Sequence, residues 1–481
     1  MTFTATDSEN QAKLKAALQD EKSASKLENL AAALLGRLLG ITVPVAKSGF
    51  QHGGDAGPAG RQGRRLRIEC KKYKDTTSLS DRELLGEIDH ALARDPALEA
   101  WVLVATREVS EQIEQDLNQH GESLGVPVII LDWKGDGLAE LAALCASAPD
   151  LVTSSFSPEA GAFAQALQSI SGDAVDRIKR DLQAWSLGFE SLRAQSVNEL
   201  EQIWNSRRAS QAALGQDAAG GAQAHRIRRK GVFETIQNWW SGGGHEDAPL
   251  AVVGLDGVGK TWATLDWLVD RKADLPIIMV IPSSAAPELG GASETAVKRF
   301  LADRLYELAG VRDREHWLRR LDNLLKSPFD EGPVLVVFFD GLNQEPSVPW
   351  LSLLKVLQSE PFAGIVRVVV SARTLFFETK LARLRGLVLP ALVAPVDVYD
   401  LSAGGELDQM LEFEGLRRGE LHQDLVPFAQ NPRLFRLVVR LRSDSLKPDG
   451  LRSIGSFGST AAIRSAFVPD NPSVRTSGVP G

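Results

Sequence analysis

The sequence predicts an α/β protein with more than one domain. Short apolar segments with the length of strands alternate along the chain with segments whose apolar residues recur at helical spacing. The chain has 481 residues, a length at which two to four domains are expected. Hydrophobic residues make up 43% and charged residues 24%, a composition typical of globular proteins in which each domain buries a core.

The first domain is predicted over residues 1–150. Residues 25–39 carry leucines at helical spacing, and Gly40 ends that helix. After a polar, glycine-rich segment, residues 65–71 alternate between apolar and polar side chains, which indicates a strand. The remaining predicted elements complete an α/β unit: helix 84–92, strand 100–106, helix 109–124, strand 126–132 and helix 138–146.

Residues 151–225 are predicted to connect this domain to a second one. Residues 158–207 have the apolar spacing of amphipathic helices. Residues 209–224 are rich in Ala, Gly and Gln, a composition that we interpret as a linker.

The second α/β domain is predicted over residues 226–395, with a doubly wound parallel sheet. Residues 396–450 are predicted to form a helical lid or winged-helix segment, since residues 398–443 are mostly helical in pattern. Residues 451–481 are expected to form a disordered tail, because this segment is rich in Ser, Gly and Pro and its apolar residues show no period. The domain itself is expected to contain a helix ending at Trp240, strand 249–254, helix 262–269, strand 276–282, helices 293–308 and 315–325, and strands 334–340 and 366–373.

A phosphate-binding loop is predicted between the first strand and helix of this domain. Residues Gly254 to Thr261 match G-x-x-x-x-G-K-[ST] at each fixed position. Gly254, Gly257 and Gly259 let successive backbone N–H groups turn inward around phosphate oxygens. Lys260 is expected to reach the β- and γ-phosphates, and the Thr261 hydroxyl to bind Mg²⁺. ATP and Mg²⁺ are therefore the predicted cofactors, and a glycine-rich turn without a ligand is the alternative.

An acid and an arginine at the ends of later strands extend this site. Asp340 ends a strongly apolar strand, where its carboxylate can hold the Mg²⁺ water shell. Hydrolytic P-loop ATPases often place a glutamate directly after this acid to polarise water, and here Gly341 occupies that position. Gln344 or Glu345 can substitute from the loop, but neither is assured, so we predict slow hydrolysis, closer to a switch than to a motor. Arg373 is a candidate sensor of the γ-phosphate, with a solvated strand-end arginine as the alternative.

These residues resemble the STAND class of signalling NTPases over roughly residues 226–445. The resemblance is carried by the phosphate-binding loop, the Asp340-Gly-Leu-Asn segment and the strand end at Ser371-Ala-Arg373. It implies a sheet followed by a helical or winged-helix lid, in which Asn431-Pro432 stands where a proline of the class contacts adenine. The class continues into a long repeat-built sensor domain. This chain does not, and the change of composition near Arg452 is expected to reflect a truncated or frameshifted gene, or a short form that relies on a separate sensor protein.

A second constellation lies in the first domain. Asp55 followed by Glu69-Cys70-Lys71 has the spacing of a PD-(D/E)xK nuclease core, and Glu69 and Lys71 leave the same face of a predicted strand. Asp55 and Glu69 form a carboxylate pair for Mg²⁺, which would activate water and stabilise charge on the phosphorane. Lys71 is expected to orient that water or neutralise the charge, with its basicity lowered beside the metal. Glu28 on the first helix is a candidate further acid, or simply a solvated helix residue.

A basic cluster in the same region consists of Arg61, Arg64, Arg65, Arg67, Lys71, Lys72 and Lys74. It provides a local phosphate-binding face in a chain of net charge −8. Residues 25–146 resemble the Mrr-type restriction endonuclease domain, which implies Mg²⁺-dependent cleavage of double-stranded DNA; an inert α/β domain with a charged strand is the alternative.

Together the two resemblances predict a nucleotide-switched DNA endonuclease, a layout shared with bacterial antiviral STAND proteins. ATP binding is expected to favour a form that assembles as a homo-oligomer and pairs the nuclease domains, so that both DNA strands are cut. A phage-derived trigger or a separate sensor protein is the expected activator.

Two other functions stay open. One is an ATP-dependent restriction or repair nuclease that translocates, although the sequence shows neither helicase motifs nor a glutamate after Asp340. The other is an ATP-binding signalling scaffold whose N-terminal domain binds DNA without cleaving it.

Cysteine usage and terminal sequence restrict the cellular setting. The two cysteines, Cys70 and Cys145, argue against a disulfide framework and against a cysteine zinc site. Residues 1–19 are polar and do not resemble a signal peptide, and no apolar run approaches the length of a membrane span. We therefore expect a cytoplasmic protein without membrane contact.

Overall fold

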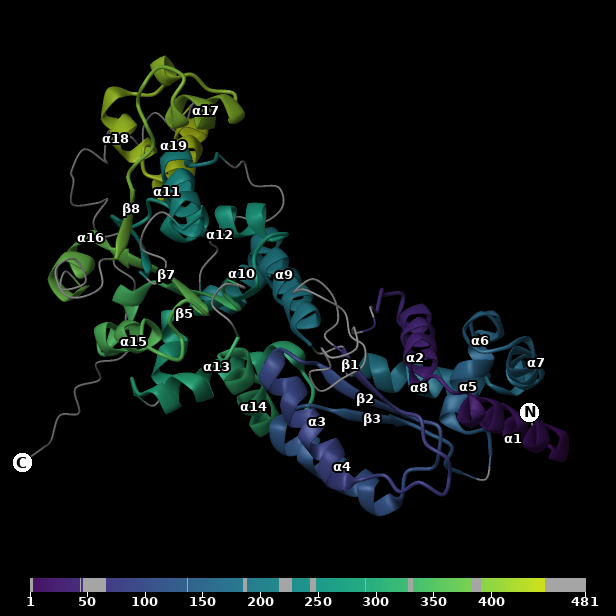
Figure 1. The fold of residues 1–481 in the computed structure, drawn as a ribbon. Helices are drawn as coiled ribbons and strands as arrows, with labels where there is room; N and C mark the ends of the chain where they lie inside the picture. The colour runs from purple at the N-terminus through teal and green to yellow at the C-terminus, as the bar shows by residue number, and fades with distance from the viewer. Residues whose placement is uncertain are drawn as a thin grey trace, which may run out of the picture.

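The computed structural model contains two parallel sheets, each at the centre of its own α/β body (Figure 1). It describes residues 3–43, 45, 66–135, 137–184, 188–215, 227–242, 248–289, 291–327, 332–381 and 391–445. The predicted α/β class is confirmed, since every strand pair of both sheets is parallel. The segment 451–481, predicted to be a disordered tail, lies outside the described residues.

The first body is built on a three-stranded sheet in the order β1-β2-β3. Helices α3 and α4 cover one face, where Leu84 and Leu117 pack with Leu103 of β2. Helices α2, α5 and α8 pack on the other face with Ile68 of β1. The elements are α1 (Ala5–Asp20), α2 (Ala24–Leu39), β1 (Leu66–Lys71), α3 (Asp81–Arg94), β2 (Ala100–Ala105), α4 (Glu111–Leu124), β3 (Val128–Leu131), α5 (Glu140–Ser147), α6 (Pro149–Ser155), α7 (Pro158–Leu167), η1 (Gln168–Ile170) and α8 (Gly172–Ala184).

Helix α1 is an element that the sequence pattern does not predict. Only Leu14 and Leu18 among its residues are buried, so the helix has too few core positions to show a helical apolar period in the sequence. A capping box between Thr4 and Asp7 starts the helix, and packing against α7 holds it. The helix therefore depends on tertiary contacts more than on amphipathic period.

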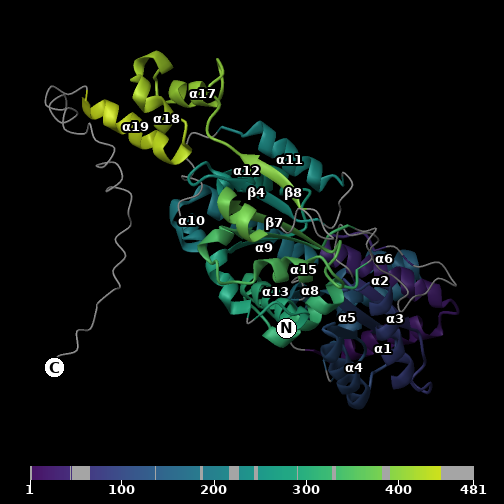
Figure 2. The same cartoon turned by 90° about the vertical axis from the view of Figure 1, so that its left-hand side faces the viewer.

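The second body is a five-stranded parallel sheet in the order β5-β6-β7-β4-β8, with helices on both faces (Figure 2). Helices α13, α14 and α15 cover one face, and α9, α10, α11 and α12 cover the other. The elements are α9 (Phe189–Asn205), α10 (Arg207–Leu214), α11 (Lys230–Trp240), β4 (Leu250–Gly254), α12 (Lys260–Arg271), β5 (Ile277–Pro282), η2 (Ser283–Leu289), α13 (Glu294–Ala309), α14 (Arg314–Leu324), β6 (Leu335–Asp340), η4 (Leu342–Gln344), α15 (Trp350–Leu357), β7 (Val366–Arg373), α16 (Thr374–Phe376), η5 (Phe377–Leu381) and β8 (Leu392–Val396).

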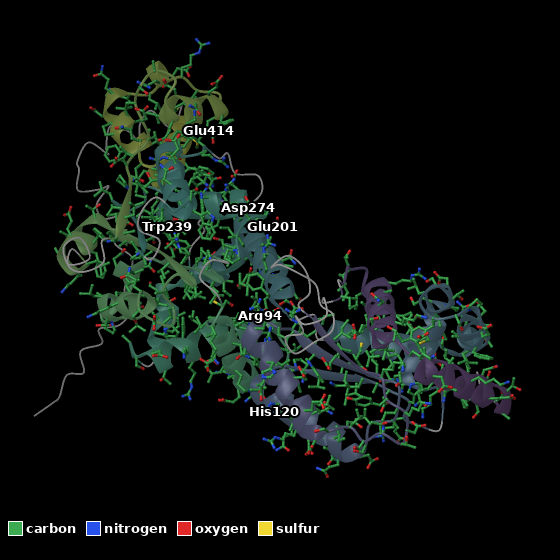
Figure 3. The ribbon with its side chains drawn as sticks, in the orientation of Figure 1. Arg94, His120, Glu201, Trp239, Asp274 and Glu414 are labelled. Atoms are coloured by element: carbon green, nitrogen blue, oxygen red, sulfur yellow. The ribbon has the colours of Figure 1, made fainter. Side chains whose placement is uncertain are left out.

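The helices predicted as a connector over residues 151–225 are divided between the two cores. Helix α8 belongs to the first core through Ile178 and Leu182, whereas α9 and α10 complete the second through Trp204 and Leu214. In Figure 3, Glu201 marks α9 beside the end of α12, where it pairs with Lys272. These helices are therefore structural parts of the two α/β bodies.

One local prediction in this body is corrected, and one strand is added that the sequence analysis does not contain. The predicted linker 209–224 begins inside helix α10, because the Ser206 side chain caps that helix and Leu214 is buried. Strand β8 is not predicted from the sequence, where Pro395 weakens the strand pattern. Among the described residues the strand pairs with β4 alone and lies at the edge of the sheet, a position at which proline is tolerated.

The segment after β8 folds as a small helical unit, which we call the lid. Its core contains Leu407, Leu411 and Phe435, and it also includes Ile227 from the segment before α11. Of the two lid types predicted, the helical one is observed, since residues 397–445 are all described and contain no strand. The lid elements are α17 (Glu406–Phe413), η7 (Arg418–Glu420), η8 (Gln423–Leu425), α18 (Val426–Ala429) and α19 (Pro432–Ser445). No helix in the described part of the chain is long and apolar enough to cross a membrane.

The two bodies meet where α14 lies against the first body, near α3 and α4 (Figure 1). The buried guanidinium of Arg320 on α14 donates through Nη1 to the carbonyl oxygen of Leu98. The amide of Asn323 donates to the carbonyl oxygen of Leu124 at 2.7 Å. Burial lowers the pKa of Arg320, and the nearby carboxylates of Asp95 and Glu99 oppose that effect. A buried cation opposite two buried carboxylates therefore joins the bodies.

Replacing Arg320 by alanine is expected to destabilise the protein by roughly 3 kcal/mol, because the carboxylates of Asp95 and Glu99 lose a compensating charge inside the joint. Thermal unfolding followed by tryptophan fluorescence measures the loss. The matched control is Arg314→Ala on the same helix, where the side chain is 62% exposed and the expected change is within about 0.5 kcal/mol. Equal shifts in the two variants would contradict this account of the joint.

Candidate functional site

The loop between β4 and α12 has the backbone of a phosphate cradle. Gly257 and Gly259 have φ angles of 76° and 93°, a region that favours glycine. Gly254 lies so close to β8 that an added Cβ would stand 2.3 Å from the carbonyl oxygen of Val396. Because α12 begins at Lys260, its N-terminus faces the loop and favours an anion there.

Thr261 and Asp340, predicted to share a metal site, are brought together across β7. The Thr261 hydroxyl lies 2.7 Å from Oδ1 of Asp340, and the Ser371 hydroxyl of β7 donates to the same oxygen at 2.6 Å. Ser371 Oγ in turn accepts the backbone N–H of Gly341 at 2.8 Å. Asp340 is buried, so these bonds offset the cost of removing its carboxylate from water.

The residues of this centre fit a magnesium ion. Neighbouring ligands of an octahedral Mg²⁺ with bonds of ~2.1 Å lie about 3 Å apart, close to the 2.7 Å between Thr261 Oγ1 and Asp340 Oδ1. Mg²⁺ commonly uses one or two carboxylates and takes its other ligands from phosphate and water. No cluster of three or more His, Cys, Asp or Glu side chains that could hold a metal occurs among the described residues. Any ion here would therefore rely on a phosphate ligand and water, which is the arrangement expected at a nucleotide site.

Lys260 is folded back over the start of the loop. Its ammonium donates to the carbonyl oxygens of Gly254 at 3.2 Å and Leu255 at 2.7 Å. Burial lowers the pKa of Lys260, and the carboxylates of Asp256 and Asp340 oppose the shift. The ammonium thus lacks a carboxylate hydrogen-bond partner in the contacts described, and a phosphate would raise its pKa.

Arg373, the predicted phosphate sensor, pairs with a carboxylate of the phosphate-binding loop. Its Nη2 lies 3.3 Å from Oδ2 of Asp256, and Nη1 of Arg433 from the lid lies 3.3 Å from the same oxygen. The backbone N–H of Arg373 donates to Oδ1 of Asn343 at 3.1 Å, which fixes the strand end. Two guanidiniums therefore converge on one carboxylate at the loop, and the sensing role of Arg373 stays a prediction.

The position after Asp340 is held by a residue without a side chain. Gly341 has a φ of 74°, and a Cβ there would lie 2.9 Å from Nε2 of Gln344. Glu345 accepts the indole N–H of Trp350 through its backbone carbonyl at 2.8 Å. The amide of Gln344 therefore covers the position where hydrolytic P-loop ATPases often place a carboxylate, and slow hydrolysis stays the prediction.

In the first body, Glu69 and Lys71 are joined by a third residue that the sequence did not single out. Lys71 Nζ lies 2.8 Å from Oε1 of Glu69 and 2.7 Å from Oε1 of Glu83 on α3. Glu69 is only 5% exposed. Burial lowers the pKa of Lys71, but the two carboxylates outweigh it and the net pKa lies above the ordinary lysine value. This raised pKa belongs to the protein without a bound metal ion, and the lowered basicity expected beside a metal stays a prediction.

The other two predicted nuclease residues are not brought into this group by the contacts described. Asp55 lies outside the described residues. Glu28 is half-buried on α2, a helix whose buried leucines pack in the core with Ile68, whereas Lys71 faces α3. The convergence of Asp55, Glu69 and Lys71 stays a prediction.

Three of the four described members of the basic cluster, Lys71, Lys72 and Lys74, have partners within the chain, whereas Nε of the fourth, Arg67, has no hydrogen-bond partner in the described part of the chain. Lys72 donates to the carbonyl oxygen of Gln19 at 3.0 Å, and Lys74 pairs with Asp20 at 2.9 Å. Both partners stand at the end of α1. Arg61, Arg64 and Arg65 lie outside the described residues. The lysines near the predicted nuclease centre are therefore partly compensated by α1 and α3.

Comparisons with known proteins add little to this geometry. No family model matches the sequence, and no curated protein does. Among solved structures the chain is similar to NtrX from Brucella abortus in complex with ATP, with a TM-score of 0.23 and 11% sequence identity over 75% of this chain and 69% of that one. A likeness this weak carries no argument, so the α/β assignment rests on the sheets themselves.

Several residues of these sites are not identified by sequence reasoning. Ser371 is visible only as part of a strand end, and its bond to Asp340 requires the order β6-β7-β4. Glu83 follows Ser80 by three residues, so the sequence indicates for it only a place in a helix cap and not a contact with Lys71. Arg433 belongs to the lid, and only the packing of the lid brings it to Asp256.

Substituting Asp340 by asparagine is expected to weaken MgATP binding by about tenfold or more, because the Thr261 site loses its charged partner. Titration with a fluorescent ATP analogue, with Mg²⁺ and with EDTA, measures the change; the variant should lose most of the Mg²⁺ dependence. Asp397→Asn is the matched control, since Asp397 is an exposed acid directly after strand β8, which is separated from β6 by β7 and β4. A metal dependence that survives in Asp340→Asn argues against this centre.

Nucleotide binding is expected to take up protons at alkaline pH. Burial lowers the pKa of Lys260 in the free protein, and a bound phosphate would raise it again. At a pH between the pKa of the free protein and that of the complex, Lys260 therefore takes up a proton when the nucleotide binds. ATP affinity should therefore fall as pH rises through the lowered pKa. Calorimetry in buffers of different ionisation enthalpy measures the uptake. Lys260→Arg, which stays protonated, should abolish it, and an unchanged uptake in that variant would exclude Lys260 as the source.

Proposed function

We propose that this protein is a Mg²⁺- and ATP-binding switch that controls a DNA endonuclease centre in its first body. The observation that carries the nucleotide half is the convergence of Thr261, Asp340 and Ser371 beside a phosphate-binding loop at the N-terminus of α12. Hydroxyl, carboxylate, ammonium and inward-turned backbone N–H groups are together the set that binds a nucleoside triphosphate with Mg²⁺.

The nuclease half of the proposal is supported by Glu69 and Lys71. They lie on one face of β1 with their charged groups 2.8 Å apart. A buried carboxylate can hold Mg²⁺, and an ammonium can neutralise the charge that grows on a phosphodiester during hydrolysis. Asp55 is proposed as the second metal ligand and Glu28 as a further acid. Double-stranded DNA is the proposed substrate.

The proposed role is antiphage defence, in which ATP-dependent assembly of a homo-oligomer pairs two nuclease centres. A phage-derived trigger or a separate sensor protein would start the assembly. Slow hydrolysis at Gly341 suits a switch, because the bound state then persists. The protein is proposed to act in the cytoplasm.

A second candidate function is an ATP-gated scaffold that binds DNA or a partner without cleaving it. One observation favours it: Lys71 is engaged by Glu69 and Glu83, and Lys72 and Lys74 are tied to α1. In that case the charges near β1 would serve stability alone. The translocating nuclease is the remaining candidate, and no contact described here favours it.

Metal binding at Glu69 separates the nuclease from the scaffold without requiring the activating trigger. We expect nucleotide-free protein to bind Mn²⁺ detectably by electron paramagnetic resonance, and Glu69→Gln to weaken that binding by about tenfold or more, since a charged ligand is lost. Asp20→Asn, which removes an exposed carboxylate paired with Lys74, is the control. Nicking of supercoiled plasmid in Mg²⁺ and ATP should likewise disappear in Glu69→Gln and Lys71→Met. Identical Mn²⁺ binding in wild type and Glu69→Gln would sink the nuclease centre.

A further inference from the structure

Three successive carbonyl groups of the phosphate-binding loop each accept a hydrogen bond from outside the loop. Asp256 O accepts from Nδ2 of Asn431 at 3.1 Å. Gly257 O accepts from the backbone N–H of Arg433 at 3.2 Å. Val258 O accepts from Nη1 of Arg229 at 3.1 Å. Two of these donors belong to the lid, and the third precedes α11.

These bonds decide which way the N–H groups of the loop point. In a planar trans peptide the carbonyl and the following N–H lie on opposite sides of the chain. Once the carbonyls of residues 256, 257 and 258 are held toward the lid and Arg229, the N–H groups of Gly257, Val258 and Gly259 must face the other way. That direction is the inside of the cradle, where successive N–H groups bind phosphate oxygens.

Arg229 connects the loop to both the sheet and the lid. Its guanidinium pairs with Glu406 of α17 at 2.8 Å and donates to the carbonyl oxygen of Asp397, just after β8, at 2.6 Å. The side chain is 7% exposed and lies over the ring of Tyr399. A buried arginine with these partners is held in one geometry, so the lid, the sheet edge and the loop are fixed to one another.

The lid reaches the loop because glycine leaves room for it. A Cβ on Gly257 would lie 2.8 Å from both Arg433 Cβ and Asn431 Oδ1, and one on Gly259 would lie 4.0 Å from Pro432 Cγ. Asn431 also starts α19, since its Oδ1 accepts the N–H of Arg433 at 3.0 Å. The same residue thus caps a lid helix and braces the loop.

We infer that Arg229, Asn431 and Arg433 are positioning residues of the phosphate cradle, and that lid docking and triphosphate binding are thermodynamically one event. This inference rests on the proposed nucleotide binding. A docked lid holds the loop N–H groups inward and raises affinity for phosphate; by reciprocity, bound phosphate favours the docked lid. Lid position is therefore the element through which nucleotide occupancy is read by the rest of the molecule.

The test compares two brace variants with a neighbouring control. Asn431→Ser keeps a helix-capping oxygen but loses the amide that reaches Asp256 O, and Arg229→Lys keeps the charge but not the branched set of donors. Arg228→Lys is the control, because Arg228 binds Asp266 at 3.1 Å and Asp270 at 2.6 Å on α12, away from the loop carbonyls.

We expect Asn431→Ser to bind MgATP about three- to tenfold more weakly and Arg229→Lys at least about tenfold more weakly, with the control within about twofold. Inorganic tripolyphosphate should show the same ratios, since the braces act on the phosphate cradle and not on the adenine. Equal affinities in all four proteins for both probes would overturn the inference.

Hydrogen–deuterium exchange of the lid segment 426–439 supplies a readout that does not require nucleotide. Without ATP, this segment should exchange faster in both brace variants than in wild type and in Arg228→Lys. Adding MgATP should slow it in wild type, and less so in the brace variants. Unchanged nucleotide-free exchange in both brace variants refutes the bracing role even where ATP binds. Failure of the wild type to bind ATP instead defeats the proposed function, while the nucleotide-free comparison still decides the bracing.

Discussion

One buried carboxylate oxygen, Oδ1 of Asp340, connects three neighbouring strands of the second sheet at their carboxyl ends. It accepts the hydroxyl of Ser371 at the end of β7 and lies 2.7 Å from the hydroxyl of Thr261, which follows β4. A carboxylate that is 3% exposed needs such partners, because an unsatisfied charge in the interior is costly. Because these partners must reach one oxygen, the ends of β6, β7 and β4 lie level with one another. This alignment places Asp340 beside the phosphate-binding loop.

The lid and the joint between the bodies extend this arrangement in opposite directions. On one side, Asn431, Arg433 and Arg229 hold the carbonyls of the loop, so that the cradle depends on segments distant in sequence. On the other side, Arg320 and Asn323 of α14 fasten the second body to the first body. In the proposed switch, a change at the loop therefore has continuous packed structure through which to act on the first body.

Local patterns in the sequence predict most strands of the two sheets and the centre of the proposed nucleotide site. The glycines, Lys260 and Thr261 are found by spacing alone, since the motif is contiguous and each position has a separate physical task. Helix α1 and strand β8 are not predicted, because α1 buries only Leu14 and Leu18 and the proline at 395 disguises an edge strand. Glu83 carries the signature of a helix cap, and nothing local in the sequence indicates its contact with Lys71.

The sequence by itself determined the α/β class, the phosphate-binding loop and the pairing of an acid with a lysine on one face of β1. These features depend on residues that are near one another along the chain, where period and motif spacing are directly readable. Only the tertiary structure decided that Ser371 shares the carboxylate of Asp340, that α9 and α10 belong to the second core, and that Arg229 and the lid brace the loop. Such contacts arise from strand order and helix packing, which bring together groups that no local pattern relates.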